Sequence, residues 1–423
     1  MYSPSLSTTW PVAGIKSRLT RAYAVAVRSS TVDVSGGQQK RPKDRKAQIA
    51  QVAAELFCAR GFHGVGLDEI AAAVGISAPA VYRHFENKYA ILVFATRRLI
   101  DATLTATDLP AAGDPWATLA ALLEALARLA TTHRDTGGLY QWEWRYLTPE
   151  HRAEFRDDLG TLLARIVTPL SAARPELTAA DANALARATL SVFVSLGTHR
   201  APIAKGRAEQ ALRRAGAAVL HDEPPTPAVP PREDDSRTVR LGSRREILLA
   251  ESIRLFRRHG YHAVNVEDIG RAAGINASSV YRYFPSKSAL LAAAFYRASD
   301  RVAEATVAAL SSSAGGADAL RRMVESYVNL TFERSDLVSV YLAENYSLPE
   351  ADRHELRKVQ RLHVEEWVRL LGAVRPELPT PEVRVLVHAA INLTTDLSRW
   401  VHFDRRTGMD RHLIRLMWTV LTA

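Results

Sequence analysis

Residues 56–92 read LFCARGFHGVGLDEIAAAVGISAPAVYRHFENKYAIL, and residues 255–291 read LFRRHGYHAVNVEDIGRAAGINASSVYRYFPSKSALL. The two segments align without a gap at an offset of 199 residues, and 17 of the 37 aligned positions are identical. Two unrelated helical stretches do not share this much through composition alone. A repeat with so long a spacing indicates that a whole domain is duplicated, because solenoid units recur every 20–50 residues.

The composition limits the class of protein. A chain of 423 residues predicts two or three domains, and the repeat favours two similar halves. The net charge of +10 suits a polyanionic partner such as nucleic acid. The single cysteine, Cys58, excludes an intrachain disulfide and fits a reducing cytoplasm. No apolar run is long enough to span a bilayer, so we expect a cytoplasmic chain without a membrane partner.

The repeated segment has the pattern of three short helices followed by a longer one. Gly61 ends the first helix, and residues 67–74 form the second. A tight turn at residues 75–77 then leads into a third helix at 78–85, which repeats at 277–284. Helix, glycine-containing turn and helix together predict a helix-turn-helix.

The remainder of each half is helical by apolar periodicity. The expected helices lie at residues 116–132, 149–171 and 179–197 in the first half, and at 317–333, 349–372 and 381–401 in the second. The sequence Arg-Pro-Glu-Leu recurs at residues 174–177 and 375–378, so the duplication continues beyond the first helices. The sequence therefore predicts an all-α protein.

The repeat and the composition also suggest domain boundaries. A stretch with five prolines and five acidic residues at 222–236 reads as an extended linker between the halves. The expected division is a disordered basic arm at 1–43, a first helix-turn-helix domain at 44–92, a first helical domain at 93–216, a linker at 217–242, a second helix-turn-helix domain at 243–291 and a second helical domain at 292–423.

The third helix of each repeat is the one that would enter the major groove of DNA. Val81 and Phe85 are four residues apart and should face the core with Ile70, which leaves the other side chains outward. Ser278 and Ser279 could bind bases or phosphates, and the tyrosines and His84 could reach phosphates or thymine methyl groups. Lys88 and Lys287 open the next helix, where an ammonium and backbone N–H groups could together bind a phosphate.

These motifs resemble the tetracycline-repressor (TetR) family in order and spacing. They are Gly-Phe/Tyr, Asp/Glu-Ile-Ala, Gly-Ile-Ser, Val-Tyr-Arg-His/Tyr-Phe and Lys-x-x-Leu/Ile-Leu. The resemblance implies a three-helix DNA-binding headpiece in each half, followed by a helical domain that binds an effector and dimerises through its last two helices. The residues expected to contact DNA are Ser77, Ala78, Pro79, Ala80, Tyr82, Arg83, His84, Lys88, Asn265, Asn276, Ala277, Ser278, Ser279, Tyr281, Arg282, Tyr283 and Lys287.

The two copies depart from the family pattern in different ways. Gly66 stands where family members carry a capping Ser or Thr, whereas Asn265 keeps a capping side chain in the second copy. The segment 78–80, Ala-Pro-Ala, offers no polar group to read a base, whereas Ser278 and Ser279 do. We therefore expect the two headpieces to read different half-sites, or the first to bind more weakly.

The effector site is less legible. Aromatic residues with one acidic residue at helical spacing could line a pocket, or could equally be ordinary bundle core. The candidates are Tyr140, Glu143, Trp144, Tyr341 and Glu344. The two glutamates are the most informative of them, since a buried acid needs a partner.

The sequence favours a DNA-binding transcriptional regulator, with repression as the family expectation. It would bind a double-stranded operator and an unknown small effector. The chain could act as a pseudo-dimer of its own halves, joined through residues 149–197 and 349–401, or as a homodimer with four headpieces. The alternative class is a ligand-binding or sequestering protein whose headpieces no longer read DNA. An enzyme is not expected, because no catalytic residues, metal ligands or cofactor motif stand out.

Overall fold

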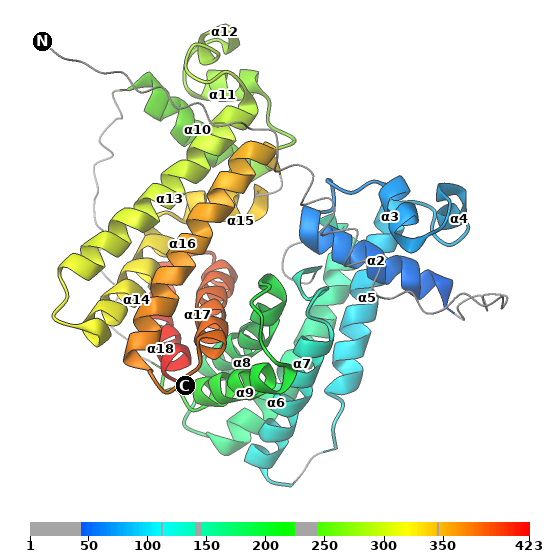
Figure 1. Cartoon of the computed structure of the whole chain (residues 1–423), viewed down its shortest axis with the longest axis vertical. Coiled ribbons are helices and arrows are strands. Elements are labelled where there is room, and N and C mark those ends of the chain that lie inside the picture. The colour runs from blue at the N-terminus through cyan, green and yellow to red at the C-terminus, as the bar shows by residue number, and fades with distance from the viewer. Residues whose placement is uncertain (1–43, 111–112, 140–145, 225–242, 345–346) are drawn as a thin grey trace, which may run out of the picture. The chain divides into compact units, whose positions relative to one another are not determined.

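The computed structural model describes residues 44–110, 113–139, 146–224, 243–344 and 347–423. The expected arm at 1–43 and residues 225–242 of the expected linker lie outside the described residues. Every regular element of the described residues is helical, which confirms the all-α class (Figure 1). None of these helices is both long and apolar enough to cross a membrane.

Most helices of the first half begin directly after a residue that favours a helix N-terminus. A Gly, Ser or Asn precedes α3, α4 and α5, and Asp or Thr caps α6, α7 and α8. The elements are α2 (Arg45–Arg60), α3 (Leu67–Val74), α4 (Ala78–Tyr82), α5 (Lys88–Ala106), α6 (Pro115–Thr132), α7 (Pro149–Ala173), α8 (Ala179–Val194), the 3₁₀ turn η3 (Ser195–Thr198) and α9 (Lys205–Leu220).

The second half repeats this order, and its helix α15 corresponds to a segment of the first half that lies mostly outside the described residues. Helices α6 and α14 each span 18 residues, and α7 and α16 each span 25 residues. The elements are α10 (Arg244–His259), α11 (Val266–Ala272), α12 (Ala277–Val280), α13 (Lys287–Ser311), α14 (Gly316–Glu333), α15 (Ser335–Glu344), α16 (Glu350–Val374), α17 (Thr380–Trp400), the 3₁₀ turn η5 (Arg405–Thr407) and α18 (Met409–Thr422).

The expected helix-turn-helix is present in both halves. Gly75 ends α3 in the left-handed conformation, at a φ of 76°, and the Ile76 N–H then donates to the Ala71 carbonyl at 2.9 Å. Gly274 has a φ of 70° in the matching turn. Val81 is fully buried and Phe85 is 5% exposed, which confirms their prediction as core residues.

The helices expected at 78–85 and 277–284 are shorter than predicted. Regular α-helix ends at Tyr82 and at Val280, and turns follow. In the second copy Pro285 disfavours a helical conformation at Phe284, because the proline ring clashes with the preceding residue. Backbone hydrogen bonds still tie Phe85 to Val81 and Phe284 to Val280, so these segments stay compact.

The two halves pack on each other within one chain. Helix α17 packs against α8 and α9, α18 packs against α9, and all four helices contribute to one continuous core. The expectation that residues 149–197 and 349–401 pair the halves was wrong in part, because it included α7 and α16 and omitted α9 and α18. Helix α9 continues to Leu220 and Asp222 is buried, so the expected linker start at 217 is too early.

Candidate nucleic-acid interface and ligand cavity

The first headpiece presents the start of α4 and the turn that follows it. Ser77 precedes the helix with an exposed side chain that makes no capping hydrogen bond. Pro79 and Arg83 are exposed, and Tyr82 is 57% exposed although it is a large aromatic residue. Ala78, Ala80 and His84 are half-buried. The expected DNA-contacting residues of this copy other than Lys88 thus share one accessible surface.

The second headpiece is more polar at the same place. The Asn276 side chain accepts the Ser279 N–H at 2.8 Å and the Ser278 hydroxyl at 2.9 Å. Ser278 therefore holds the cap of α12 in this conformation as well as facing solvent. Tyr281 is 52% exposed and Tyr283 43% exposed. The remaining expected contacts of this surface are the half-buried Ala277 and the exposed Arg282.

The N-terminal caps of α3 and α11, the second helices of the two headpieces, explain how the first headpiece tolerates Gly66. Asn265 accepts the Asp268 N–H at 2.8 Å, and Asp268 accepts the Asn265 N–H in return. At Gly66 only the second half of this exchange remains, because the Glu69 carboxylate accepts the Gly66 N–H at 2.8 Å. That hydrogen bond, together with Arg60, lowers the pKa of Glu69.

The expected phosphate contacts of Lys88 and Lys287 stay a prediction, and both ammonium groups bond to carbonyls of their own headpiece. The Lys88 ammonium donates to the carbonyls of Phe62 and Val65 at 2.8 and 2.9 Å, and it lies 4.5 Å from the centre of the Phe62 ring. Lys287 makes the matching bonds at 2.9 and 2.8 Å. Burial lowers the pKa of both lysines. These side chains fix the loop after the first helix of each headpiece.

Replacing Lys88 with methionine should therefore lower the stability of the headpiece. Two partly buried carbonyls would lose their donor, so the free energy of unfolding should fall by about 1–3 kcal/mol. Urea denaturation measures this loss, with Lys358→Met, at an exposed position of α16, as the control. Unchanged stability together with weaker DNA binding would support the phosphate role instead.

The two expected effector residues that the structure describes, Tyr341 and Glu344, do not line the cavity described below. Tyr140, Glu143 and Trp144 lie outside the described residues. The Glu344 carboxylate accepts the backbone N–H of Tyr261 at 3.1 Å and the Ser347 hydroxyl at 3.0 Å, so it anchors the second headpiece to the bundle. Tyr341 packs on the Phe295 ring at 4.8 Å between centres, and burial raises its pKa. Both residues thus have structural partners instead of a pocket.

A cavity of about 900 Å³ lies instead within the bundle of the first half. Helices α5, α6, α7 and α8 contribute most of its wall, and residues of the second half, from α10, α15 and the end of α17, complete it. Apolar side chains dominate the wall, and a volume of this size accommodates a drug-sized ligand. The wall also carries polar and charged residues, among them Thr96, Thr103, His133, Ser191, Arg156, Asp158, Arg187, Arg257, Asp396 and Arg399. Burial and the charge of Arg98 lower the pKa of His133, which favours a neutral ring beside the cavity.

Contacts between the halves follow an approximate two-fold symmetry. Ser191 and Asn392 occupy matching positions of α8 and α17, and they contact each other: the Asn392 amide donates to the Ser191 carbonyl at 3.0 Å. The Ser191 hydroxyl donates to Asp396 at 2.6 Å. Residues that meet their own counterparts characterise an isologous interface, which two-fold dimers use.

A second set of contacts obeys the same symmetry. The Arg187 guanidinium lies 4.7 Å from the centre of the Trp400 ring. The matching residues in the other half are His388 and His199, whose rings stack at 4.0 Å between centres. Burial lowers the pKa of His199 to about 2 and that of His388 to about 4. Both histidines are therefore held neutral in the interface.

The repeated Arg-Pro-Glu-Leu segments also find a structural explanation. Arg174 donates to the carbonyls of Leu220 and Asp222 at 3.0 and 2.7 Å, which are at the end of α9. Arg375 donates to the last two carbonyls of the chain in the same way. Each arginine thus caps the C-terminal end of an interface helix, where a cation is favourable.

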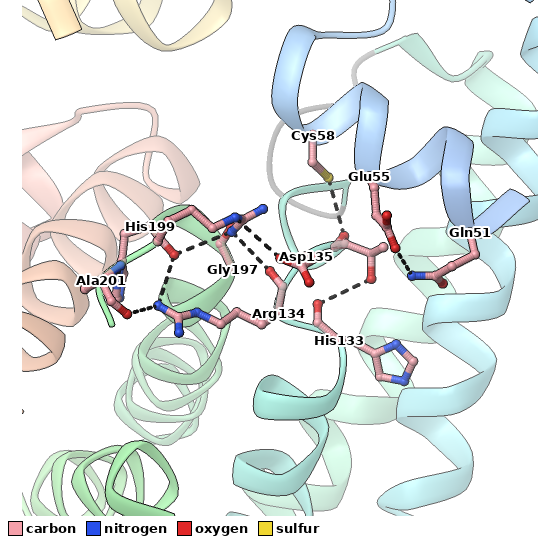
Figure 2. Close-up of polar contacts among 11 residues, drawn as sticks. Gln51, Glu55, Cys58, His133, Arg134, Asp135, Gly197, His199 and Ala201 are labelled. Atoms are coloured by element: carbon pink, nitrogen blue, oxygen red, sulfur yellow. Dashed lines mark hydrogen bonds and ion pairs between the residues drawn. The ribbon is translucent and has the colours of Figure 1, made fainter. Parts of the chain in front are cut away.

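The loop at residues 133–138 joins the first headpiece to this interface (Figure 2). The Cys58 thiol lies 3.7 Å from the Thr136 carbonyl, and Arg134 donates to the carbonyls of His199 and Ala201 at 3.3 and 2.6 Å. Arg257, the counterpart of Cys58, forms an ion pair with Asp336. Each headpiece is thus tied to its own bundle at the same point.

The described residues contain no group of three or more His, Cys, Asp or Glu side chains arranged to hold a metal ion.

The architecture defines the class of protein. Each half of the chain has an exposed helix-turn-helix surface and a helical bundle, so the chain is a tandem protein built from two such units.

Comparison with known proteins identifies these units. Residues 49–93 and 248–294 both match the family model described as bacterial regulatory proteins, tetR family, and residues 313–407 match a tetracyclin repressor-like C-terminal domain. The chain belongs to the TetR family and carries two TetR-like units in tandem.

Individual relatives match only parts of the chain. The transcriptional activator FasR of Mycolicibacterium smegmatis is 39% identical over 61 residues, 14% of this chain and 28% of that protein. The transcriptional repressor KstR2 of Rhodococcus jostii is 28% identical over 119 residues, 28% of this chain and 58% of that protein. A solved structure, the ketosteroid transcriptional regulator KstR2 of Mycobacterium tuberculosis, is 22% identical with a TM-score of 0.38, and covers 43% of this chain and 95% of that one. The chain thus spans only part of the curated relatives it matches.

Proposed function

We propose that the chain is a sequence-specific, ligand-responsive DNA-binding repressor in which the two halves act as one pseudo-dimer. The observation that carries this proposal is the pairing of α8 and α9 with α17 and α18 about an approximate two-fold axis. That pairing gives one chain two headpieces, as a two-fold operator requires. The division into two headpieces, two effector and dimerisation domains and a linker, with its boundaries shifted as described, is part of this proposal.

The proposed mechanism follows from linkage. A ligand in the cavity of the first half would favour one arrangement of helices α5 to α8 over another. Because Ser191 lies both in the cavity wall and in the interface, that preference would alter how the halves pair. A changed pairing would no longer match the spacing of the two half-sites, so DNA would be released.

The first experiment selects DNA fragments bound by the full-length chain from a genomic library of its source organism, and then measures affinity for the best fragment in a salt series. We expect specific binding that weakens steeply with salt, because lysines and arginines displace counterions from phosphates. Tyr82→Ala and Tyr281→Ala should each weaken it about 10-fold, which corresponds to about 1.4 kcal/mol. Leu362→Ala, at a 61% exposed position of α16, is the matched control.

The outcomes separate the rival functions. Loss of affinity with both tyrosine variants, but not with the control, supports a regulator that uses both headpieces. Only weak, sequence-independent binding would favour the sequestering protein instead. Sedimentation on the minimal operator distinguishes the assemblies, since two chains per site would replace the pseudo-dimer with a homodimer that has four headpieces.

A further inference from the structure

The two bundles differ in their interiors although their helices correspond. Helices α6 and α14 have the same length and align Leu126 with Tyr327. Helices α7 and α16 likewise align Leu162 with His363, and Ile166 with Trp367. At three corresponding positions, aliphatic residues of the first half are therefore replaced by ring side chains in the second.

These three rings fill the second bundle. The Trp367 indole N–H donates to His363 Nε2 at 3.0 Å, and the Tyr327 ring packs edge-on against Trp367 at 5.9 Å between centres. Trp367 is only 1% exposed. The hollow that remains beside them measures about 10 Å³. A space of this size is at the lower limit for one water molecule, so no organic ligand fits.

The first bundle keeps an unused polar group where the second has an aromatic ring. Thr96 lines the cavity and is 1% exposed, but its hydroxyl has no hydrogen-bond partner among the described residues. Thr103, two turns further along the same helix and also in the wall, donates to the Leu99 carbonyl at 2.8 Å. The counterpart of Thr96 is Phe295, which is buried in the core of the second half. A buried hydroxyl without a partner is costly, so a ligand group that bonds to it would gain affinity.

We infer that this chain binds one small-molecule ligand, in the first half only, and that the ligand is a largely apolar molecule with a hydrogen-bonding group that meets the Thr96 hydroxyl. The inference rests on the proposed function for the consequence of binding, but not for the binding itself. A largely apolar ligand suits the site because most of the residues that line the cavity are apolar. The second half then acts as a fixed partner that positions its headpiece without a ligand of its own.

Ligand stoichiometry in the absence of DNA tests this inference. The probe is N-phenyl-1-naphthylamine, a neutral aromatic amine with one N–H group whose fluorescence rises in an apolar environment. Titration of the full-length chain should give one site per chain. Two equal sites would overturn the inference, as would no binding at all. Because DNA is absent, failure here is separate from failure of the proposed function.

Matched variants locate the site. Leu126→Tyr places in the first half the side chain that fills the second, and should abolish probe binding while thermal unfolding shows a folded chain. Thr96→Val should weaken binding about 5-fold, the loss of one hydrogen bond. Thr103→Val is the control and should leave affinity unchanged, because its hydroxyl is already bonded within the helix. Equal effects of the two threonine variants, or full binding by Leu126→Tyr, would overturn the assignment.

Discussion

Lowering the pH from 7.5 to 5 should destabilise the paired halves by about 4 kcal/mol through His199 and His388 alone. An unfolded histidine titrates near pH 6.5, whereas burial holds the pKa of His199 at about 2 and that of His388 at about 4. Below pH 6.5 the unfolded chain binds protons that the folded chain cannot. Stability is therefore full above this pH and falls as the pH drops from 6.5 towards 4, by about 2 kcal/mol for each ring at pH 5.

The surroundings of the two rings support this sign. Besides burial, the positive charges of Arg134, Arg200 and Arg384 disfavour a positive charge on either histidine, and the negative charge of Glu365 opposes this effect at His388. The rings also stack on each other at 4.0 Å, so protonating one disfavours protonating the other. His199 Nδ1 accepts the Ala201 N–H at 3.2 Å, which assigns the proton of the neutral ring to Nε2.

Urea denaturation at the two pH values measures the effect. His388→Leu removes one of the two groups, so this variant should lose about 2 kcal/mol less than the wild-type chain between pH 7.5 and 5. His354→Gln, at an exposed position of α16, should keep the full loss. If His388→Leu had the pH dependence of the wild-type chain, the histidine stack would not be the source of it.

The helices of the headpieces could be predicted from the sequence almost completely, because residues close together in the sequence determine where these helices begin and end. Capping residues, a glycine at positive φ and the spacing of Val81 and Phe85 each act within a few residues. Lys88 shows where this reasoning ends. The sequence shows a cation at the start of a helix, but its partners are two carbonyls more than 20 residues away. Whether an ammonium faces solvent or a loop depends on tertiary packing.

The cavity could not be predicted, because a cavity is a property of what the side chains leave unfilled. Leu126 and Leu162 follow the same apolar period as any core residue, and nothing in the period distinguishes a filled from an unfilled bundle. A comparison of the two halves at corresponding positions does indicate where a cavity lies. The aromatic residues Tyr327 and Trp367 stand opposite aliphatic ones, so the repeat itself indicates which half has room.

The interface helices α9 and α18 were missed although both have an apolar stripe. Helix α9 buries Leu212, Val219 and Leu220 together with three alanines and Gly216. Helix α18 has a clear apolar stripe through Leu413, Leu416 and Met417, so the sequence pattern was sufficient to find it. Both helices lie in the interface between the halves. An apolar pattern predicts that a helix has a buried face, but it does not predict which other helix covers that face.

Replacing Gly197 with alanine should destabilise the junction between the first headpiece and the interface. A Cβ atom at this position would lie 2.9 Å from Gly137 Cα and 3.1 Å from the Gly137 carbonyl carbon. These are backbone atoms, so they cannot move aside as the end of a flexible side chain does. The loop at 133–138 must shift, and we expect a loss of about 1–3 kcal/mol in the free energy of unfolding, as overpacked cores show.

A graded series of alanine variants separates this effect from the general effect of losing a glycine. At Gly137 the added Cβ would lie 3.3 Å from Gly197 Cα, so Gly137→Ala should cost less than Gly197→Ala. At Gly206, near the start of α9, nothing lies within 4 Å, and alanine should stabilise the helix slightly. Urea denaturation ranks the three variants by their free energy of unfolding.

The same substitution should also affect DNA binding. Since the loop at 133–138 carries the Cys58 and Arg134 contacts, Gly197→Ala should weaken operator binding more than Gly206→Ala does. Equal DNA affinity in these two variants, despite unequal stability, would mean that the junction supports the fold without positioning the headpiece.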